Sequence, residues 1–135
     1  MQNRVTKQQA INLKKLGYDL PTNAYYHETS NNVDEVSDYG IWLEYLTIYS
    51  APTISDAIQW MWDRFKINAF TQNQINQNGT VRWLMYYSTP ESTHEHNFKA
   101  WYNDRDITTR EKAQSAVLDN AILYQLDKMG LNETT

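Results

Sequence analysis

The sequence predicts an α+β domain in which an antiparallel sheet of about four strands carries three helices packed mainly on one face. Two observations point to this fold class. The apolar periodicity changes from two residues over Leu43 to Tyr49 to the helical spacing of Ile54, Ala57, Ile58 and Met61. Helical and strand-like segments also follow one another in the order helix, strands, helix, strands, helix.

Length and composition predict how the chain is organised. The 135 residues are 41% hydrophobic and 13% aromatic, which is typical of one folded domain with one core, spanning residues 1–135. The sequence contains no cysteine, and this excludes disulfides, thiolate catalysis and cysteine-ligated metals. We expect no cofactor.

Charge and hydropathy narrow the classes of partner. The net charge is -4, and only Lys14 and Lys15 are adjacent basic residues, so the sequence argues against nucleic-acid binding. No apolar run approaches the ~18 residues that a membrane span needs, and none follows the residues at the N-terminus. We therefore expect no membrane partner and a cytoplasmic location.

The N-terminal third predicts a helix, a short strand and a loop. Thr6 and Gln9 fit a capping box, and the helix that they open should end before Gly17. Ala24 to His27 reads as a short strand. Residues 29–40 have the polar composition of a surface loop.

The middle of the chain combines a buried strand with an aromatic helix. Ile41 to Tyr49 is apolar on both faces, which predicts a strand covered on both sides. Thr53 can cap the following helix, on which Trp60 and Trp62 should point in nearly opposite directions, because two residues rotate the helix by about 200°. Ile67 to Phe70 is a short strand candidate, and the Asn- and Gln-rich residues 72–79 should form a loop.

The C-terminal third predicts the strongest strand and a two-sided helix. Val81 to Tyr87 alternates between two faces, and Phe98 to Tyr102 is its expected antiparallel partner. Thr108 with Glu111 should open the last helix, and Gly130 should close it. That helix carries two apolar stripes, so it is either sandwiched between other elements or meets a partner chain.

Several short motifs carry a resemblance to a known group. These are Lys14 to Tyr18, Pro21 to Tyr26, and Ser50 to Thr53 with Ala57 and Trp60, and the segment Tyr102 to Leu126 adds a strand, a short turn and an Ala-rich helix. The chain resembles small uncharacterised proteins encoded by Bacteroides-type gut bacteria and their phages. The resemblance implies a phage or mobile-element origin and an α+β fold, and it transfers no activity. Residues 72–78 and 88–97 depart from the usual spacing of the group.

Two sets of residues are candidates for binding. Sheet faces rich in Trp and Tyr are typical of protein-binding hot spots, and single-stranded nucleic acid could stack on the same rings. Few basic residues lie among them, so protein recognition is favoured over nucleic acid. The aromatic candidates are Trp42, Tyr45, Trp83, Tyr86 and Trp101, and the candidates on the second stripe of the last helix are Leu118, Ile122 and Leu126.

Metal binding and catalysis have weaker support. His94 and His96 would point the same way in an extended segment, but two imidazoles do not complete a metal site. Exposed loop histidines are the favoured explanation of the pair. No nucleophile elbow, phosphate-binding loop or His-Glu-x-x-His motif is present. Active sites built from distant residues leave no local pattern, so the sequence leaves an enzyme open.

Three functional hypotheses follow. The first is a small, non-enzymatic, phage-like accessory protein that binds a protein partner or itself, with a homodimer as one form. The second is a ligand-binding or enzymatic domain with a pocket between sheet and helices, lined by tyrosines and a few carboxylates. The third is a component of a virion or host-takeover complex, which differs from the first only in its partner.

Overall fold

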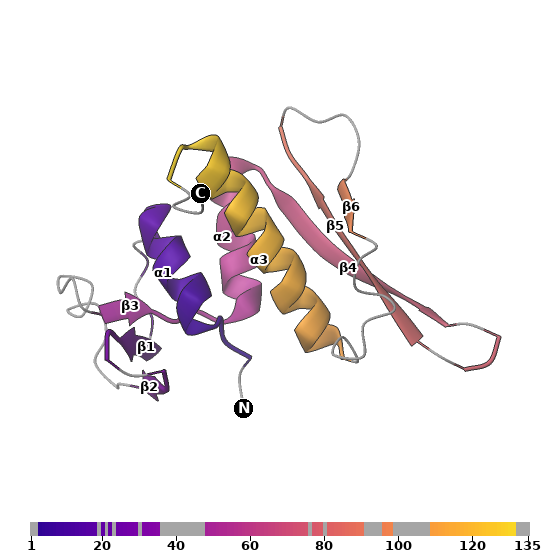
Figure 1. The fold of residues 1–135 in the computed structure, drawn as a ribbon, viewed down its shortest axis with the longest axis horizontal. Helices are drawn as coiled ribbons and strands as arrows, with labels where there is room; N and C mark the ends of the chain where they lie inside the picture. Colours follow the sequence, from indigo (N-terminus) through magenta and orange to yellow (C-terminus); the bar gives the residue numbers. More distant parts are fainter. Residues whose placement is uncertain are drawn as a thin grey trace. The chain divides into compact units, whose positions relative to one another are not determined.

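The computed structural model describes residues 3–18, 20, 22, 24–29, 31–35, 48–75, 77–79, 81–90, 96–98 and 109–131. Within these ranges the chain forms three helices and six strands, an α+β mixture (Figure 1). The strands build two antiparallel sheets of three strands each, in the orders β2-β1-β3 and β4-β5-β6. The chain groups into two compact units, residues 1–56 with 122–135 and residues 57–121, so that the division falls inside helix α2 and inside helix α3.

The first unit contains helix α1 (Lys7–Lys15) and the small sheet of β1 (Ala24–His27), β2 (Val33–Glu35) and β3 (Ile48–Ser50). β1 is the central strand and pairs with both neighbours. α1 contacts β3, where the Lys14 ammonium donates to the Ile48 carbonyl at 3.1 Å and lies 5.0 Å from the centre of the Tyr49 ring.

The predicted capping box of α1 is confirmed at both of its bonds. The Gln9 N–H donates to the Thr6 hydroxyl oxygen at 3.1 Å, and the Gln9 side chain accepts from the Thr6 N–H at 2.9 Å. At the other end, Gly17 adopts a left-handed φ of 98°, and the Tyr18 N–H reaches back to the Leu13 carbonyl at 2.9 Å. This is a Schellman ending, which favours glycine because a Cβ is strained at positive φ.

The segment before α1 is tied into the first unit by backbone and side-chain hydrogen bonds. The Val5 N–H donates to the Pro52 carbonyl at 3.1 Å, and the Ile54 N–H donates to the Asn3 carbonyl at 2.9 Å. The buried Tyr26 hydroxyl donates to the Val5 carbonyl at 2.7 Å. The Arg4 guanidinium adds a 2.7 Å bond to the Ala51 carbonyl.

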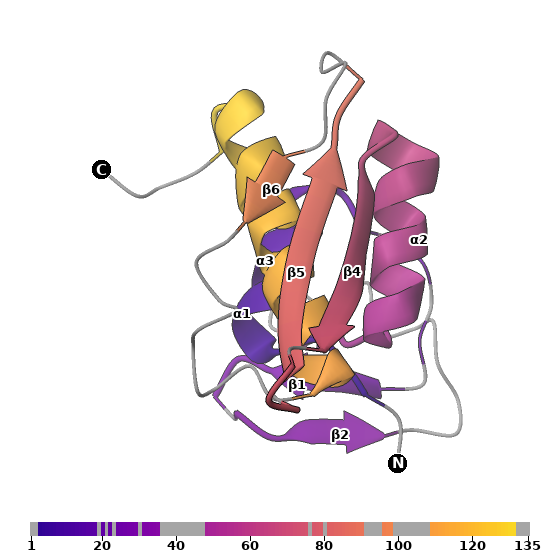
Figure 2. The same cartoon turned by 90° about the vertical axis from the view of Figure 1, so that its right-hand side faces the viewer.

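The second unit is built on a long hairpin. β4 (Asn68–Ile75) and β5 (Val81–Ser88) pair antiparallel through eight residues each, and β6 (His96–Phe98) pairs with the other edge of β5. In Figure 2 this sheet faces the viewer, the residues of α3 that belong to the unit lie behind it, and α2 lies on the side of the outer edge of β4. The sheet therefore has an inner face toward the helices and an outer face away from them.

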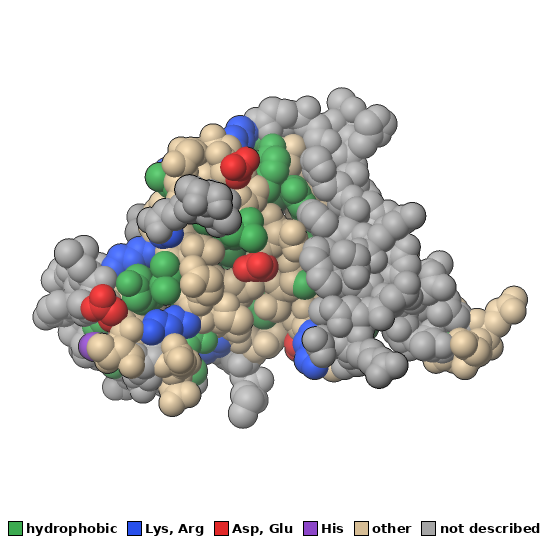
Figure 3. All heavy atoms as spheres, in the orientation of Figure 1, with side chains coloured by type: hydrophobic (Ala, Val, Ile, Leu, Met, Phe, Trp, Pro, Cys, Tyr) green, Lys and Arg blue, Asp and Glu red, His purple; other side chains and the backbone are tan. Residues whose placement is uncertain are grey.

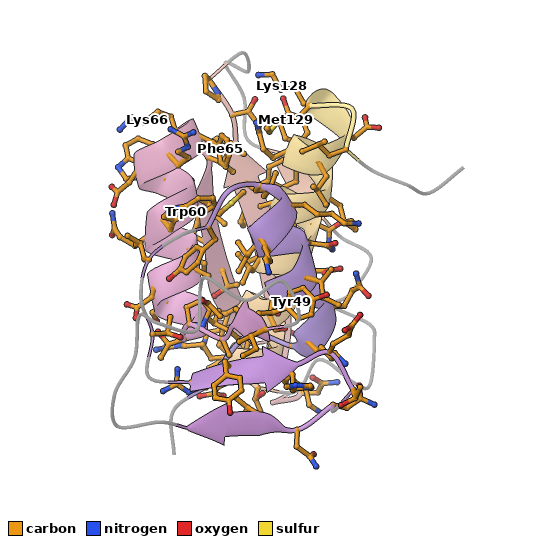
Figure 4. The ribbon with its side chains drawn as sticks, turned by 90° about the vertical axis from the view of Figure 1, so that its left-hand side faces the viewer. Tyr49, Trp60, Phe65, Lys66, Lys128 and Met129 are labelled. Atoms are coloured by element: carbon orange, nitrogen blue, oxygen red, sulfur yellow. The ribbon has the colours of Figure 1, made fainter. Side chains whose placement is uncertain are left out.

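Helix α2 (Ile54–Phe65) begins as the sequence predicts, because the Asp56 N–H donates to the Thr53 hydroxyl at 3.1 Å. The expected division of its indoles is also confirmed: Trp60 is 7% exposed and Trp62 is 44% exposed. The Trp60 ring packs edge-on against Phe65, with ring centroids 5.5 Å apart. Figure 4 shows Trp60 on the body of the helix, and Phe65 and Lys66 at its end.

Helix α3 (Arg110–Lys128) buries both of its apolar stripes. Ala113, Val117 and Ala121 are buried on one stripe, and so are Leu118, Ile122 and Leu126 on the other. The alternative in which the helix is sandwiched within its own chain therefore accounts for the second stripe.

Several expected boundaries are corrected. One sheet of about four strands is not shown, because the described strands form two sheets. The polar segment 29–40 includes strand β2, and the amide-rich segment 72–79 contains the second half of β4, because both segments are held by antiparallel partners. The last helix is capped by Thr109 rather than by Thr108, since the Lys112 N–H donates to the Thr109 hydroxyl at 3.2 Å.

Candidate functional site

The aromatic candidates from the sequence fall into three groups. Trp83 lies on β5 and is buried on the inner face, where its indole Nε1 has no hydrogen-bond partner among the described residues. Tyr86 lies on the outer face of the same strand and is half-buried. Trp42, Tyr45 and Trp101 lie outside the described residues. Only Tyr86 therefore remains as a described aromatic candidate for surface recognition.

The α3 candidates are not available for binding. Leu118 and Ile122 are fully buried and Leu126 is 2% exposed, so no free interface is formed by this stripe. A partner chain is not needed to explain why these residues are apolar. The expectation of an interface on the second stripe of the last helix is therefore corrected.

The outer face of the β4–β5 hairpin is the surface around Tyr86. Cross-strand neighbours in an antiparallel pair lie on the same face, so the register places Asn68 with Ser88, Phe70 with Tyr86 and Gln72 with Leu84. We call these six residues the outer face. Phe70 and Tyr86 stack at its centre, with ring centroids 5.1 Å apart and planes 16° from parallel. Both rings are half-buried, which leaves part of each ring accessible.

None of these six residues is charged, and the next pair of the register on the same side of the hairpin, Gln74 with Arg82, contributes one basic residue. Phe70, Tyr86 and Leu84 supply apolar area, while the amides and the hydroxyl around them supply donors and acceptors. An apolar centre with a neutral polar border is the composition of a protein-binding patch, because desolvating it does not bury an unpaired charge.

The turn end of the hairpin is more open than its beginning. Figure 1 shows β4 and β5 extending past the start of α3. Gln72, Asn73 and Ile75 are all exposed, and Ile75 is 70% exposed, more than any other large hydrophobic side chain among the described residues. β4 is also an outer strand of its sheet, and no described strand pairs with its free edge.

A second exposed aromatic lies on α2. The Lys66 ammonium sits 5.2 Å from the centre of the Trp62 ring, a cation–π contact at the end of the helix. Lys66 has a φ of 59°, and it is the only non-glycine residue with positive φ in the described part of the chain. Its N–H donates to the Trp62 carbonyl at 2.9 Å, so the strained residue closes the helix as glycine closes α1 and α3.

No protein-family model, curated protein or solved structure matches this chain. The structure's own chemistry therefore carries the functional argument.

Among the described residues, three groups have a shifted pKa, and none of the three lies on the outer face. Burial raises the pKa of the Asp119 carboxyl on α3 and lowers the pKa of the Lys14 ammonium on α1. Burial also raises the pKa of the Tyr26 hydroxyl, while the charge of Arg4 opposes that shift.

Among the described residues, no three His, Cys, Asp or Glu side chains gather into a metal-binding group. His94 lies outside those residues, and His96 is placed on β6 opposite Tyr87 by the backbone register. None of the helices in the described ranges is long and apolar enough to cross a bilayer. Figure 3 shows both acidic and basic side chains on one face of the molecule, separated by polar and apolar ones.

Sequence reasoning missed Phe70 as a partner of Tyr86, and it missed the exposure of Ile75. Phe70 was expected at the end of a short strand, and no pattern in the amide-rich residues after it indicates that they continue the pairing. The one usable signal is Ile75, an isolated β-branched residue in a polar run. Ile75 follows Phe70 by five residues, as Tyr86 follows Val81 by five residues on the other strand.

Proposed function

We propose that this chain is a small non-enzymatic interaction protein that binds a protein partner through the outer face of the β4–β5 hairpin. The stacked pair of Phe70 and Tyr86, half-exposed on a sheet face away from the helices, is the observation that carries this proposal. A cytoplasmic location and an origin in a phage or mobile element, both expected from the sequence, belong to the same proposal.

The physical support comes from what the pair would contribute to an interface. Two rings held in contact by their strands have already lost much of their rotational freedom, so ordering them on binding costs little. Aromatic residues at the centre of an interface, surrounded by polar groups that exclude water, are common hot spots. The neutral border of Asn68, Gln72 and Ser88 can hydrogen-bond to a partner without the desolvation cost of a charge.

The experiment is affinity capture from a lysate of a Bacteroides-type host, with the wild-type chain and the double variant Phe70→Thr with Tyr86→Thr. Threonine favours strands, so the backbone of the hairpin should be retained while the rings are removed. We expect a protein that is retained by the wild type and lost by the variant. Circular dichroism and thermal unfolding confirm that both chains are folded.

A matched control introduces threonine at an exposed residue in the turn of the same hairpin, Gln77→Thr, which lies outside the outer face. This control should keep the partner, because it leaves the ring pair intact. If no protein is enriched by the wild type, or if the ring variant retains the same partner as the control, the outer face is not the binding surface.

A further inference from the structure

We propose that the free edge of β4 pairs antiparallel with β4 of a second copy of this chain. This inference goes beyond the proposed function, because it uses the edge of the sheet, whereas the partner proposed above covers the outer face. The two surfaces share β4 but present different groups: side chains on the face, and backbone N–H and C=O groups along the edge.

The edge offers unused backbone hydrogen-bonding groups. In an antiparallel sheet every second residue of an outer strand directs its N–H and C=O away from its neighbour. β4 is an outer strand over all eight of its residues, and no described strand takes up that edge. Figure 2 shows α2 on the side of this edge, whereas the last residues of β4 extend away from α2 and past the start of α3 (Figure 1), so a second strand can approach the edge there.

The edge lacks the devices that commonly prevent pairing. Natural edge strands are protected by charged residues, proline, bulges or short length. β4 contains neither charge nor proline, and the nearest charged residues in the sequence are Lys66 before it and Arg82 after the turn. Its register with β5 runs through eight consecutive pairs without a bulge. The edge of β4 is therefore long enough, and unprotected enough, for another strand to pair with it.

A second copy fits the charge and the symmetry of the edge. The chain carries a net charge of -4, but β4 contains no charged residue, so self-pairing of β4 sets no like charges opposite each other within the paired strands. A two-fold axis beside Asn73 places Asn73 opposite its own copy, Gln72 opposite Gln74, and Ile75 opposite Thr71. In that register the amide side chains of Asn and Gln lie opposite one another, and the exposed Ile75 side chain gains a cross-strand neighbour.

The first test is the mass in solution over a concentration series, measured by light scattering on the wild type, Asn73→Lys and Gln77→Lys. Lysine at position 73 sets two ammonium groups opposite each other at the axis, and like charges in that position destabilise a strand pair. We expect a concentration-dependent dimer of the wild type that Asn73→Lys weakens ~10-fold or more. Gln77 is exposed in the turn of the same hairpin, so Gln77→Lys should dimerise as the wild type does.

The second test uses the absence of cysteine. A single Asn73→Cys thiol would meet its copy across the axis, where directly opposed Cα atoms lie ~4.5–5.5 Å apart, within the range that a disulfide bridges. Under mild oxidation, Asn73→Cys should form a covalent dimer at least ~10-fold faster than Gln77→Cys at equal concentration. Equal rates would overturn the proposed pairing.

The outcomes separate this inference from the proposed function. A strictly monomeric wild type, or a dimer that Asn73→Lys leaves unchanged, overturns the pairing of β4 and leaves the outer-face proposal standing. A dimer that depends on Asn73, in a chain whose capture experiment finds no ring-dependent partner, supports the pairing and removes the outer-face proposal.

Discussion

β4 and β5 have the same length and pair with each other along all of it, yet they are built in opposite ways. β5 buries Trp83, Met85 and Tyr87 on the inner face, so it is held by the core. On β4 only Ala69 is buried there, while Asn73 and Ile75 at the turn end are exposed. This difference shows that hydrogen bonds to a well-packed neighbouring strand can maintain a strand that buries few side chains itself.

The largest expected contrast is between two residues that face each other across the hairpin. Met85 is fully buried on β5, and its cross-strand neighbour Thr71 on β4 is half-buried. Met85→Ala should lower the free energy of unfolding by ~2–5 kcal/mol, because it leaves a cavity. Thr71→Ala should cost less than ~1 kcal/mol. Urea unfolding measures both, and equal losses would show that the core holds both strands alike.

The next contrast concerns the aromatic pair that joins the two strands on the outer face. A double-mutant cycle with Phe70→Ala and Tyr86→Ala should give a coupling of ~0.5–1.5 kcal/mol between the rings. The adjacent pair of Gln72 and Leu84 has no ring contact, so its cycle should give a smaller coupling. Equal couplings in the two cycles would mean that strand pairing, and not ring stacking, accounts for the interaction.

A third test addresses where β4 begins. Lys66 closes α2 in a left-handed conformation, one residue before Ile67 and the strand. Both Lys66→Gly and Lys66→Ala lose the contact with Trp62, but only Lys66→Gly relieves the backbone strain. Lys66→Gly should therefore be more stable than Lys66→Ala by ~1 kcal/mol in thermal or urea unfolding. An alanine variant as stable as the glycine variant would argue against the left-handed ending.

The smallest effect is expected at the turn end of β4. Ile75→Ala should change the stability of the monomer by less than ~0.5 kcal/mol, because the side chain is 70% exposed. The measurement belongs at low protein concentration, where pairing between copies does not contribute. A loss above ~1 kcal/mol would place Ile75 in a core contact and weaken the contrast between the two strands.

Features that depend on the spacing of residues close together in the chain could be predicted from the sequence. The α1 capping box, β5, and the division of Trp60 from Trp62 are confirmed because each depends on a local spacing. The second half of β4 could not be predicted, since its amides become a strand through pairing with distant residues. The number of sheets depends on the same long-range pairing.

The candidate site was predicted only in part. Tyr86 was among the aromatic candidates and lies on the outer face, but its alternation partner Trp83 faces inward and is buried. Periodicity separates the two faces of a strand without saying which face the helices cover. For the same reason the two stripes of α3 indicated either a partner or a sandwich, and only their burial distinguishes the two.

The hydrogen bonds that tie residues 3–5 to the segment from Pro52 to Ile54 should slow amide exchange and proteolysis in these residues. Chain ends commonly fray, so their amides exchange with solvent quickly and proteases cut there first. Here the Val5 N–H and the Asn3 carbonyl are both hydrogen-bonded, and the buried Tyr26 hydroxyl donates to the Val5 carbonyl. The Val5 amide should therefore exchange as slowly as amides inside α1, and limited proteolysis should spare this segment until the first unit opens.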